Sequence, residues 1–177
     1  MGVLGRPGAG EFAPSFEGYI RLVPGDDVIA ALVGQGEALR ATLAAIPEAK
    51  AGHRYAEGKW SVREVLGHII DSERVFGYRA LAFARGEQAA LPSFDENAYA
   101  REAGHDAAPL LELVEEFAFL RASHVHMLRH FPEDAWTRSG TASGKPVTVR
   151  ALAFIIAGHA AHHLELLHER YGVPRVG

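Results

Sequence analysis

Four long segments with helical periodicity place the strongest constraint on the fold of this chain. Apolar residues recur every three or four positions across residues 27–45, 61–84, 109–130 and 148–172, which is the spacing of helices that bury one face. No stretch between these segments alternates polar and apolar residues for long enough to predict a sheet. Four helices of about 19 to 24 residues predict an all-α domain with the architecture of a four-helix bundle.

The ends of these segments carry residues that start or stop helices. The first segment opens at Asp26 and Asp27, either of which can be the N-cap. Ser61 and Glu64 form the S-x-x-E pattern of a capping box. Gly172 ends the fourth segment, as is common at a helix C-terminus. These residues support the helix boundaries independently of the periodicity.

The rest of the chain precedes or connects these helices. Residues 87–108 form a longer link than adjacent antiparallel helices need, so we expect a crossover that makes the second and third helices parallel. Within this link, residues 94–100 can form a short helical turn. The Gly- and Pro-rich residues 1–16 are expected to be a flexible extension, followed by a single domain over residues 17–177.

The composition excludes several classes of protein. The chain has no Cys, so it offers neither a disulfide nor a protein thiolate for catalysis or metal binding. Its net charge of −4 argues against a nucleic-acid partner. The N-terminus lacks the apolar core of a secretory signal, and the longest apolar run, residues 151–157, is too short to cross a bilayer. We therefore expect a cytoplasmic protein that binds neither nucleic acid nor membrane.

Ten His residues are the unusual part of this composition, and two pairs have the i, i+4 spacing that puts two imidazoles on one helix face. In the fourth segment, His159 and His163 fall within the apolar stripe. His162 falls at its edge, although an i, i+3 pair can also bind a metal ion. In the third segment, His126 and His130 lie opposite the apolar stripe and should face solvent. The pair His159/His163 is therefore the better candidate for half of a metal site.

Three other polar side chains are expected to point toward the interior. His68 lies at the border of the apolar stripe of the second segment, with Asp71 one turn away. Arg121 and His124 share the inward side of the third segment. Taken alone, a His on an apolar helix face is more often a hydrogen-bonded core residue than a ligand, and inward Arg and His are more often structural than catalytic. Both interpretations stay open on these residues alone.

Three stretches of the chain form a recognisable pattern. They are KWSVREVLGHIIDSER at residues 59–74, FDENAYA at 94–100 and AFIIAGHAAHHLELL at 153–167. With these stretches the chain resembles the DinB/YfiT-like superfamily of metal-binding four-helix bundles, over most of residues 55–171. The most specific feature is W-S-x-x-E-x-x-x-H followed later by H-x-x-x-H. The resemblance implies the bundle fold.

The resemblance also implies a metal site with three ligands, which fall on His68, His159 and His163. All three positions hold His, and the additional His162 could join the site or replace a ligand. Three neutral imidazoles leave at least one coordination position for water or substrate, as in catalytic sites. Zn²⁺ and Ni²⁺ are the favoured ions, and Mn²⁺ or Fe²⁺ would also accept imidazole.

Members of the resembled family suggest two kinds of reaction at such a site. In the first, the metal stabilises the thiolate of a low-molecular-weight thiol such as bacillithiol or mycothiol, which attacks an electrophilic substrate. In the second, the metal activates water and the protein is a hydrolase. We favour thiol S-transfer, because the helix faces near the three His offer no inward Glu or Asp as a general base. Asp71 is the nearest carboxylate. We interpret it as a hydrogen-bond partner of a metal-ligating His or as a surface residue.

Further hypotheses concern substrate binding and assembly. Arg121 or Arg150 could pair with a carboxylate of the thiol or substrate, because a guanidinium pairs bidentately with carboxylates. The alternative to an enzyme is a bundle in which a structural metal locks the second and fourth helices together. A fourth protein ligand, such as His162 or His124, would favour that alternative. The resemblance also suggests a homodimer.

Overall fold

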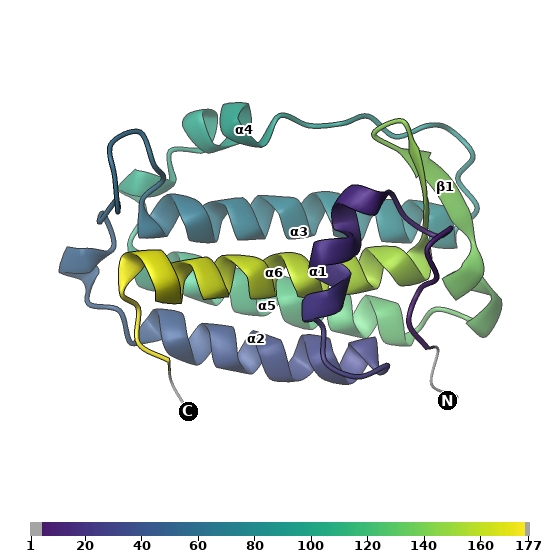
Figure 1. Cartoon of the computed structure of the whole chain (residues 1–177), viewed down its shortest axis with the longest axis horizontal. Coiled ribbons are helices and arrows are strands. Elements are labelled where there is room, and N and C mark those ends of the chain that lie inside the picture. Colours follow the sequence, from purple (N-terminus) through teal and green to yellow (C-terminus); the bar gives the residue numbers. More distant parts are fainter. Residues whose placement is uncertain (1–4, 176–177) are drawn as a thin grey trace.

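The computed structural model describes residues 5–175 and shows a bundle of four long helices (Figure 1). They are α2 (Val28–Ala44), α3 (Val62–Ala84), α5 (Leu110–Arg129) and α6 (Val149–Tyr171). Each end lies within one residue of the boundary expected from the sequence, so the all-α four-helix bundle is confirmed. None of the described helices is both long enough and apolar enough to pass through a membrane.

Side-chain caps fix the N-termini of three of these helices. Asp27 accepts a hydrogen bond from a backbone N–H in the first turn of α2. Ser61 and Glu64 form the complete capping box before α3, and Thr148 caps α6 in the same way as Asp27 caps α2. Each cap satisfies a backbone N–H that has no partner within the helix. Local sequence therefore sets where these helices begin.

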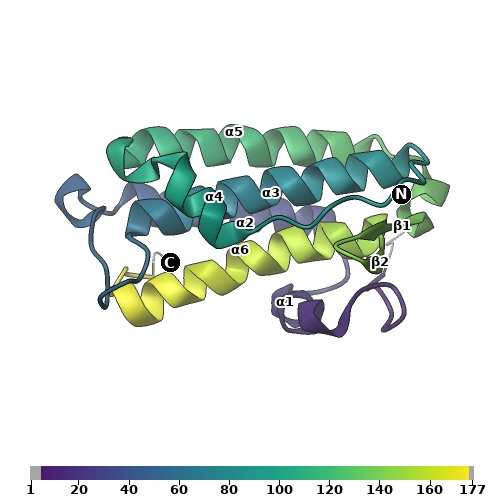
Figure 2. The same cartoon turned by 90° about the horizontal axis from the view of Figure 1, so that it is seen from above.

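The order of the helices brings α3 and α6, which lie far apart in the sequence, side by side. The chain runs in one direction along α3 and α5, and in the opposite direction along α2 and α6 (Figures 1 and 2). The segment after α3 crosses back along the bundle and carries the short helix α4 (Glu96–Ala103). Helix α3 packs against antiparallel α6, and α2 packs against antiparallel α5. The predicted crossover and the parallel pair are confirmed.

Several short elements were not expected from the periodicity. Helix α1 (Glu17–Leu22) packs on α6, and strands β1 (Ser139–Ala142) and β2 (Lys145–Thr148) form an antiparallel hairpin before α6. The expectation of no strands was wrong because four-residue strands are too short to show alternation. The turn between them holds Ser143 and Gly144 at φ 53° and 72°, as a two-residue hairpin turn requires. The described elements also include short 3₁₀ turns, namely η1 (Pro14–Phe16), η2 (Glu48–Lys50), η3 (His105–Ala107) and η4 (Glu133–Thr137).

Two apolar clusters fill the bundle, one toward each end. The cluster near α1 and the hairpin includes Leu32, Phe83, Leu128 and Phe154. The cluster at the opposite end includes Leu39, Leu66, Phe117 and Leu167. A polar level lies between them, formed by the buried side chains of His68, Glu73, Arg121, His159 and His163. Because buried polar groups are costly unless they are paired, this level is where specific interactions are expected.

The N-terminal segment makes contacts with the start of α6. Glu11 accepts hydrogen bonds from the side chains of Thr148 and Arg150. Residues 1–4 of the expected extension lie outside the described residues. The flexibility of residues 1–16 stays a prediction.

Candidate metal centre

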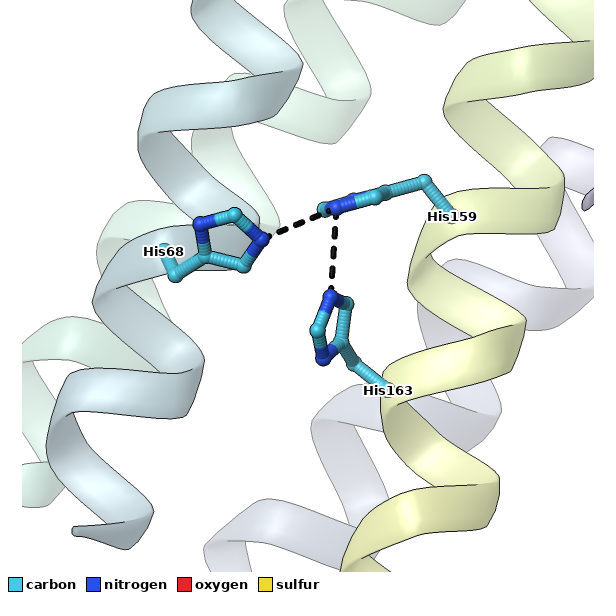
Figure 3. A group of neighbouring side chains, drawn as sticks. All are labelled: His68, His159 and His163. Atoms are coloured by element: carbon cyan, nitrogen blue, oxygen red, sulfur yellow. Dashed lines mark hydrogen bonds between the residues drawn. The ribbon is translucent and has the colours of Figure 1, made fainter. Parts of the chain in front are cut away.

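Three imidazoles from α3 and α6 converge in the polar level of the bundle (Figure 3). The Nε2 atom of His159 lies 3.0 Å from Nε2 of His68 and 3.2 Å from Nε2 of His163. One nitrogen from each ring lies within 4.8 Å of the other two. The i, i+4 spacing on α6 turns two rings toward α3, and the packing of α3 brings the third ring to meet them.

Hydrogen bonding alone cannot satisfy this cluster. A neutral imidazole has one N–H and one acceptor nitrogen, so Nε2 of His159 can donate to one neighbour or accept from one neighbour, but it cannot satisfy both. A tetrahedral ion with Zn–N distances of about 2.0–2.1 Å separates its nitrogen ligands by about 3.3 Å. The observed separations of 3.0 and 3.2 Å fit that arrangement. The three residues therefore fit a divalent metal ion.

Burial keeps these imidazoles neutral near pH 7. Desolvation, with a smaller effect of nearby His rings, lowers the pKa of His68 to about 4 and the pKa of His163 to about 3. The pKa of His159 is lowered well below its usual range by the same causes. Because neutral imidazole is the form that binds a metal ion, the folded chain offers three lone pairs without releasing protons.

The outer nitrogen of one imidazole lacks a partner. Nδ1 of His163 is buried and makes no hydrogen bond to the described residues. Among the described residues, the group that could bind a metal ion consists of three His and includes no Asp or Glu. Metal-binding His residues usually donate their outer N–H to a carboxylate, a carbonyl or water. This centre therefore depends on helix packing, more than on a carboxylate, to orient the ring of His163.

Aromatic rings surround the three imidazoles. The ring centroid of Trp60 lies 4.7 Å from that of His68. The rings of Tyr19 and Phe76 lie 5.4 and 5.8 Å from the ring of His159. These side chains give the centre an apolar wall, which strengthens electrostatic interactions inside it by excluding water.

Gly158 explains how α1 reaches this wall. A Cβ atom at this position would lie 2.0 Å from the backbone oxygen of Tyr19, so only Gly allows α1 to pack directly on α6. This contact sets Tyr19 beside His159. Tyr19 was not expected from the sequence because a six-residue helix shows too little periodicity. Trp60 belongs to the recognised motif, but nothing in the motif indicated its contact with His68.

His162, His126, His130 and Asp71 lie outside the three-His group, although the ring centroid of His162 is 5.1 Å from that of His163. His163 belongs to the three-His group, whereas His162 is exposed and does not. Asp71 forms an ion pair on its own helix, with a nitrogen–oxygen distance of 3.6 Å. His126 and His130 are exposed, as their helical phase predicted.

Arg121 and His124 point inward, but toward a different group. Arg121 donates to both carboxylate oxygens of Glu73, at 2.8 and 2.7 Å, and to oxygens of Leu32 and Gln35. Nδ1 of His124 lies 3.3 Å from Glu73. Burial alone would raise the pKa of Glu73, but Arg121 and His124 lower it below its usual range. The guanidinium of Arg121 is therefore occupied by its own chain, which contradicts the role in binding a substrate carboxylate considered for it from the sequence.

Arg150 lies at the start of α6, away from the centre. Its Nε lies 3.1 Å from a carboxylate oxygen of Glu11, and at 1.5 Å per residue it is about 13 Å along the helix from His159. Its role in binding a substrate carboxylate stays a prediction.

A four-helix bundle with a long crossover and a buried three-His group defines the structural class of this protein. The chain belongs to the DinB superfamily, whose family profile matches residues 31–167. This match confirms the resemblance drawn from the three sequence stretches.

Two solved structures share the fold at low sequence identity. YfiT from Bacillus subtilis, described as a probable metal-dependent hydrolase with an unusual four-helix bundle topology, is similar with a TM-score of 0.70 and 18% identity, over 97% of this chain and 99% of YfiT. A mycothiol-dependent maleylpyruvate isomerase is similar with a TM-score of 0.65 and 16% identity, over 83% of this chain and 62% of the isomerase. This chain therefore spans less than two thirds of the isomerase. Comparison with curated protein sequences gives no significant match.

Proposed function

We propose that this protein is a divalent-metal-dependent enzyme that activates a low-molecular-weight thiol for attack on an electrophile. The proposed ligands are His68, His159 and His163. The observation that carries the proposal is the convergence of three neutral Nε2 atoms whose lone pairs hydrogen bonding cannot satisfy. An ion that takes four ligands has one position left for a small molecule. Zn²⁺ or Ni²⁺ suits imidazole ligands best, and Mn²⁺ or Fe²⁺ is the alternative.

The surroundings of the centre favour thiol transfer over hydrolysis. A bound divalent ion lowers the pKa of a coordinated thiol so that thiolate forms near neutral pH. The chain holds the three imidazoles between two packed helices, and Trp60, Tyr19 and Phe76 line the centre with aromatic rings. Such a wall accommodates sulfur and an apolar electrophile well. Glu73 is a buried carboxylate on α3, contrary to the expectation of no inward Glu or Asp, but Arg121 and His124 already hold it, so it is not free to take a proton from water.

The related structures support a small-molecule reaction without choosing between the two chemistries. YfiT is described as a probable metal-dependent hydrolase, and the isomerase depends on mycothiol. Hydrolysis is therefore the second candidate, and assembly as a homodimer and a cytoplasmic location stay predictions.

Metal analysis followed by a transferase assay tests the proposal. The purified protein should contain bound divalent metal, and the loaded protein should transfer one of a panel of thiols, including bacillithiol and mycothiol, to monochlorobimane. His68→Ala and His163→Ala should each weaken metal binding by more than about 100-fold, because ligand loss exceeds the effect of losing an outer contact. His126→Ala is the matched control, since it belongs to an i, i+4 pair that is exposed, and it should leave both measurements unchanged.

The same samples distinguish the alternatives. Turnover of esters or amides without added thiol would favour hydrolysis. A tightly bound metal that raises thermal stability, with no turnover of any thiol or hydrolytic substrate, would favour a structural metal. Thiol transfer at the wild-type rate after metal removal, or by the His68→Ala variant, would contradict the proposed mechanism.

A further inference from the structure

Arg79 is a buried cation with no carboxylate partner among the residues that the structure describes. Its exposed fraction is 4%, and its Nη2 donates to the carbonyl of Pro92 at 2.7 Å and to Oγ of Ser143 at 3.0 Å. Both acceptors are neutral, and Nε and Nη1 make no hydrogen bond within the described part of the chain. Burial lowers the pKa of Arg79, because an uncompensated charge is costly in the protein interior.

A second buried arginine shows what is missing at this site. Arg121 is 3% exposed, and its guanidinium forms a two-bond pair with the carboxylate of Glu73. Arg79 is equally buried, but its partners are two neutral oxygens bonded to the same nitrogen and the ring of Phe76, whose centroid lies 5.9 Å from Cζ. Arg121 has an anionic partner, whereas Arg79 has none among the described residues.

A small cavity that is partly open to solvent lies against Arg79. It measures about 20 Å³ and is bounded by α3, α6, the hairpin and residues just before α1. Lys145 lines it as a second cation, and none of its lining residues is acidic. This volume corresponds to about one water molecule. The cavity therefore suits a single small polar group and is too small for a whole substrate.

The hairpin turn holds one of the Arg79 partners in an unusual conformation. Ser143 has a φ of 53° and is the one residue other than Gly with a positive φ in the described part of the chain. The two-residue turn between β1 and β2 requires this conformation. The turn thereby directs the Ser143 hydroxyl to Arg79 and places Lys145 at the cavity.

We propose that Arg79 and Lys145 bind a small anionic group in this cavity, with a carboxylate as the best fit. The two remaining nitrogens of the guanidinium can donate to one carboxylate oxygen, and the space of about one water molecule admits that oxygen. Phe76 lines the cavity, and its ring lies 5.8 Å from the ring of His159, so the anion site and the metal centre share a wall. That the carboxylate belongs to the thiol or to its electrophile rests on the proposed function, whereas binding of the anion does not.

Titration with formate, the smallest carboxylate, tests this site. The amide resonances of Ser143 and Phe76 are followed by NMR in the full-length protein, before and after metal removal. Ionic strength is held constant with a morpholinoethanesulfonate salt, whose anion is too large for the cavity. Both resonances should shift in a saturable way, and the shift should persist after metal removal. Its persistence separates this site from formate bound at the metal centre.

Three variants complete the test. Arg79→Gln should abolish the saturable shift, and Lys145→Gln should weaken formate binding about two- to fivefold, as expected for an exposed charge. Lys145 is exposed, so its variant remains informative if Arg79→Gln fails to fold. Arg85→Gln, an exposed residue just after α3, should leave binding unchanged. No saturable shift, a shift lost with the metal, or equal effects of Lys145→Gln and Arg85→Gln would overturn the proposal.

Discussion

Mild acid should destabilise the metal-free protein through its buried imidazoles. In the folded chain, His68 and His163 have pKa values of about 4 and about 3, against 6.5 for an ordinary imidazole. Below pH 6.5 the unfolded chain therefore binds protons that the folded chain does not. The stability that these groups contribute is fully present above pH 6.5 and is lost as the pH falls toward 4 and then 3.

The size of this effect follows from the protonation of the unfolded chain. Between pH 7.5 and pH 5.5, each imidazole that stays neutral in the folded chain lowers the free energy of unfolding by about 1.4 kcal/mol. His68 and His163 have pKa values well below 5.5, and the pKa of His159 is also strongly lowered. The three together should lower the free energy of unfolding by about 4 kcal/mol, which is a large part of the 5–15 kcal/mol of an ordinary domain.

Urea unfolding in the presence of a chelator, followed by tryptophan fluorescence at both pH values, measures this difference. His163→Leu should reduce the pH dependence by about 1.4 kcal/mol, because one neutral buried imidazole is removed. His126→Leu, a substitution of the same kind at an exposed position outside the centre, is the control and should leave it unchanged. Equal stability at pH 7.5 and 5.5, or an unchanged pH dependence in His163→Leu, would refute the reasoning.

Other substitutions test the packing around the centre. Glu73→Gln should lower the free energy of unfolding by about 3–5 kcal/mol in urea, because it leaves the Arg121 cation buried without its partner; a loss below 1 kcal/mol would show that the pair is not desolvated. Gly158→Ala should cost about 1–3 kcal/mol and increase amide hydrogen exchange around Tyr19, because the added Cβ collides with that backbone; unchanged exchange would contradict this contact. Ser61→Ala should cost about 1–2 kcal/mol in thermal unfolding, because it removes both the α3 cap and the hydrogen bond that the hydroxyl donates to Asp106; an unchanged melting temperature would contradict this role.

The long helices could be predicted because their signals are local. Periodicity over about 20 residues and a capping group such as Ser61 identify a helix without knowledge of its neighbours. The four-residue strands and the six-residue helix α1 gave no comparable signal, because they are stabilised by contacts with α6 and α3 rather than by their own sequence.

The candidate centre was predictable only in part, for a related reason. Helical phase oriented His159 and His163 toward the core, but His68 came from the family resemblance, because its phase lay at the border of its apolar stripe. Phase also placed Arg121 inward without showing its partner. The distance between Glu73 and Arg121 depends on how α3 and α5 pack, and no single helix contains that information.

The connection between His68 and His159 has a consequence for the order of folding. These residues are 91 positions apart in the sequence, and closing a flexible loop of that length costs about 4 kcal/mol of chain entropy. The residues of α6 are also the last of the four long helices to leave the ribosome. The three imidazoles therefore come together only after α6 has docked. A metal ion would then stabilise a nearly complete bundle and would not nucleate its formation.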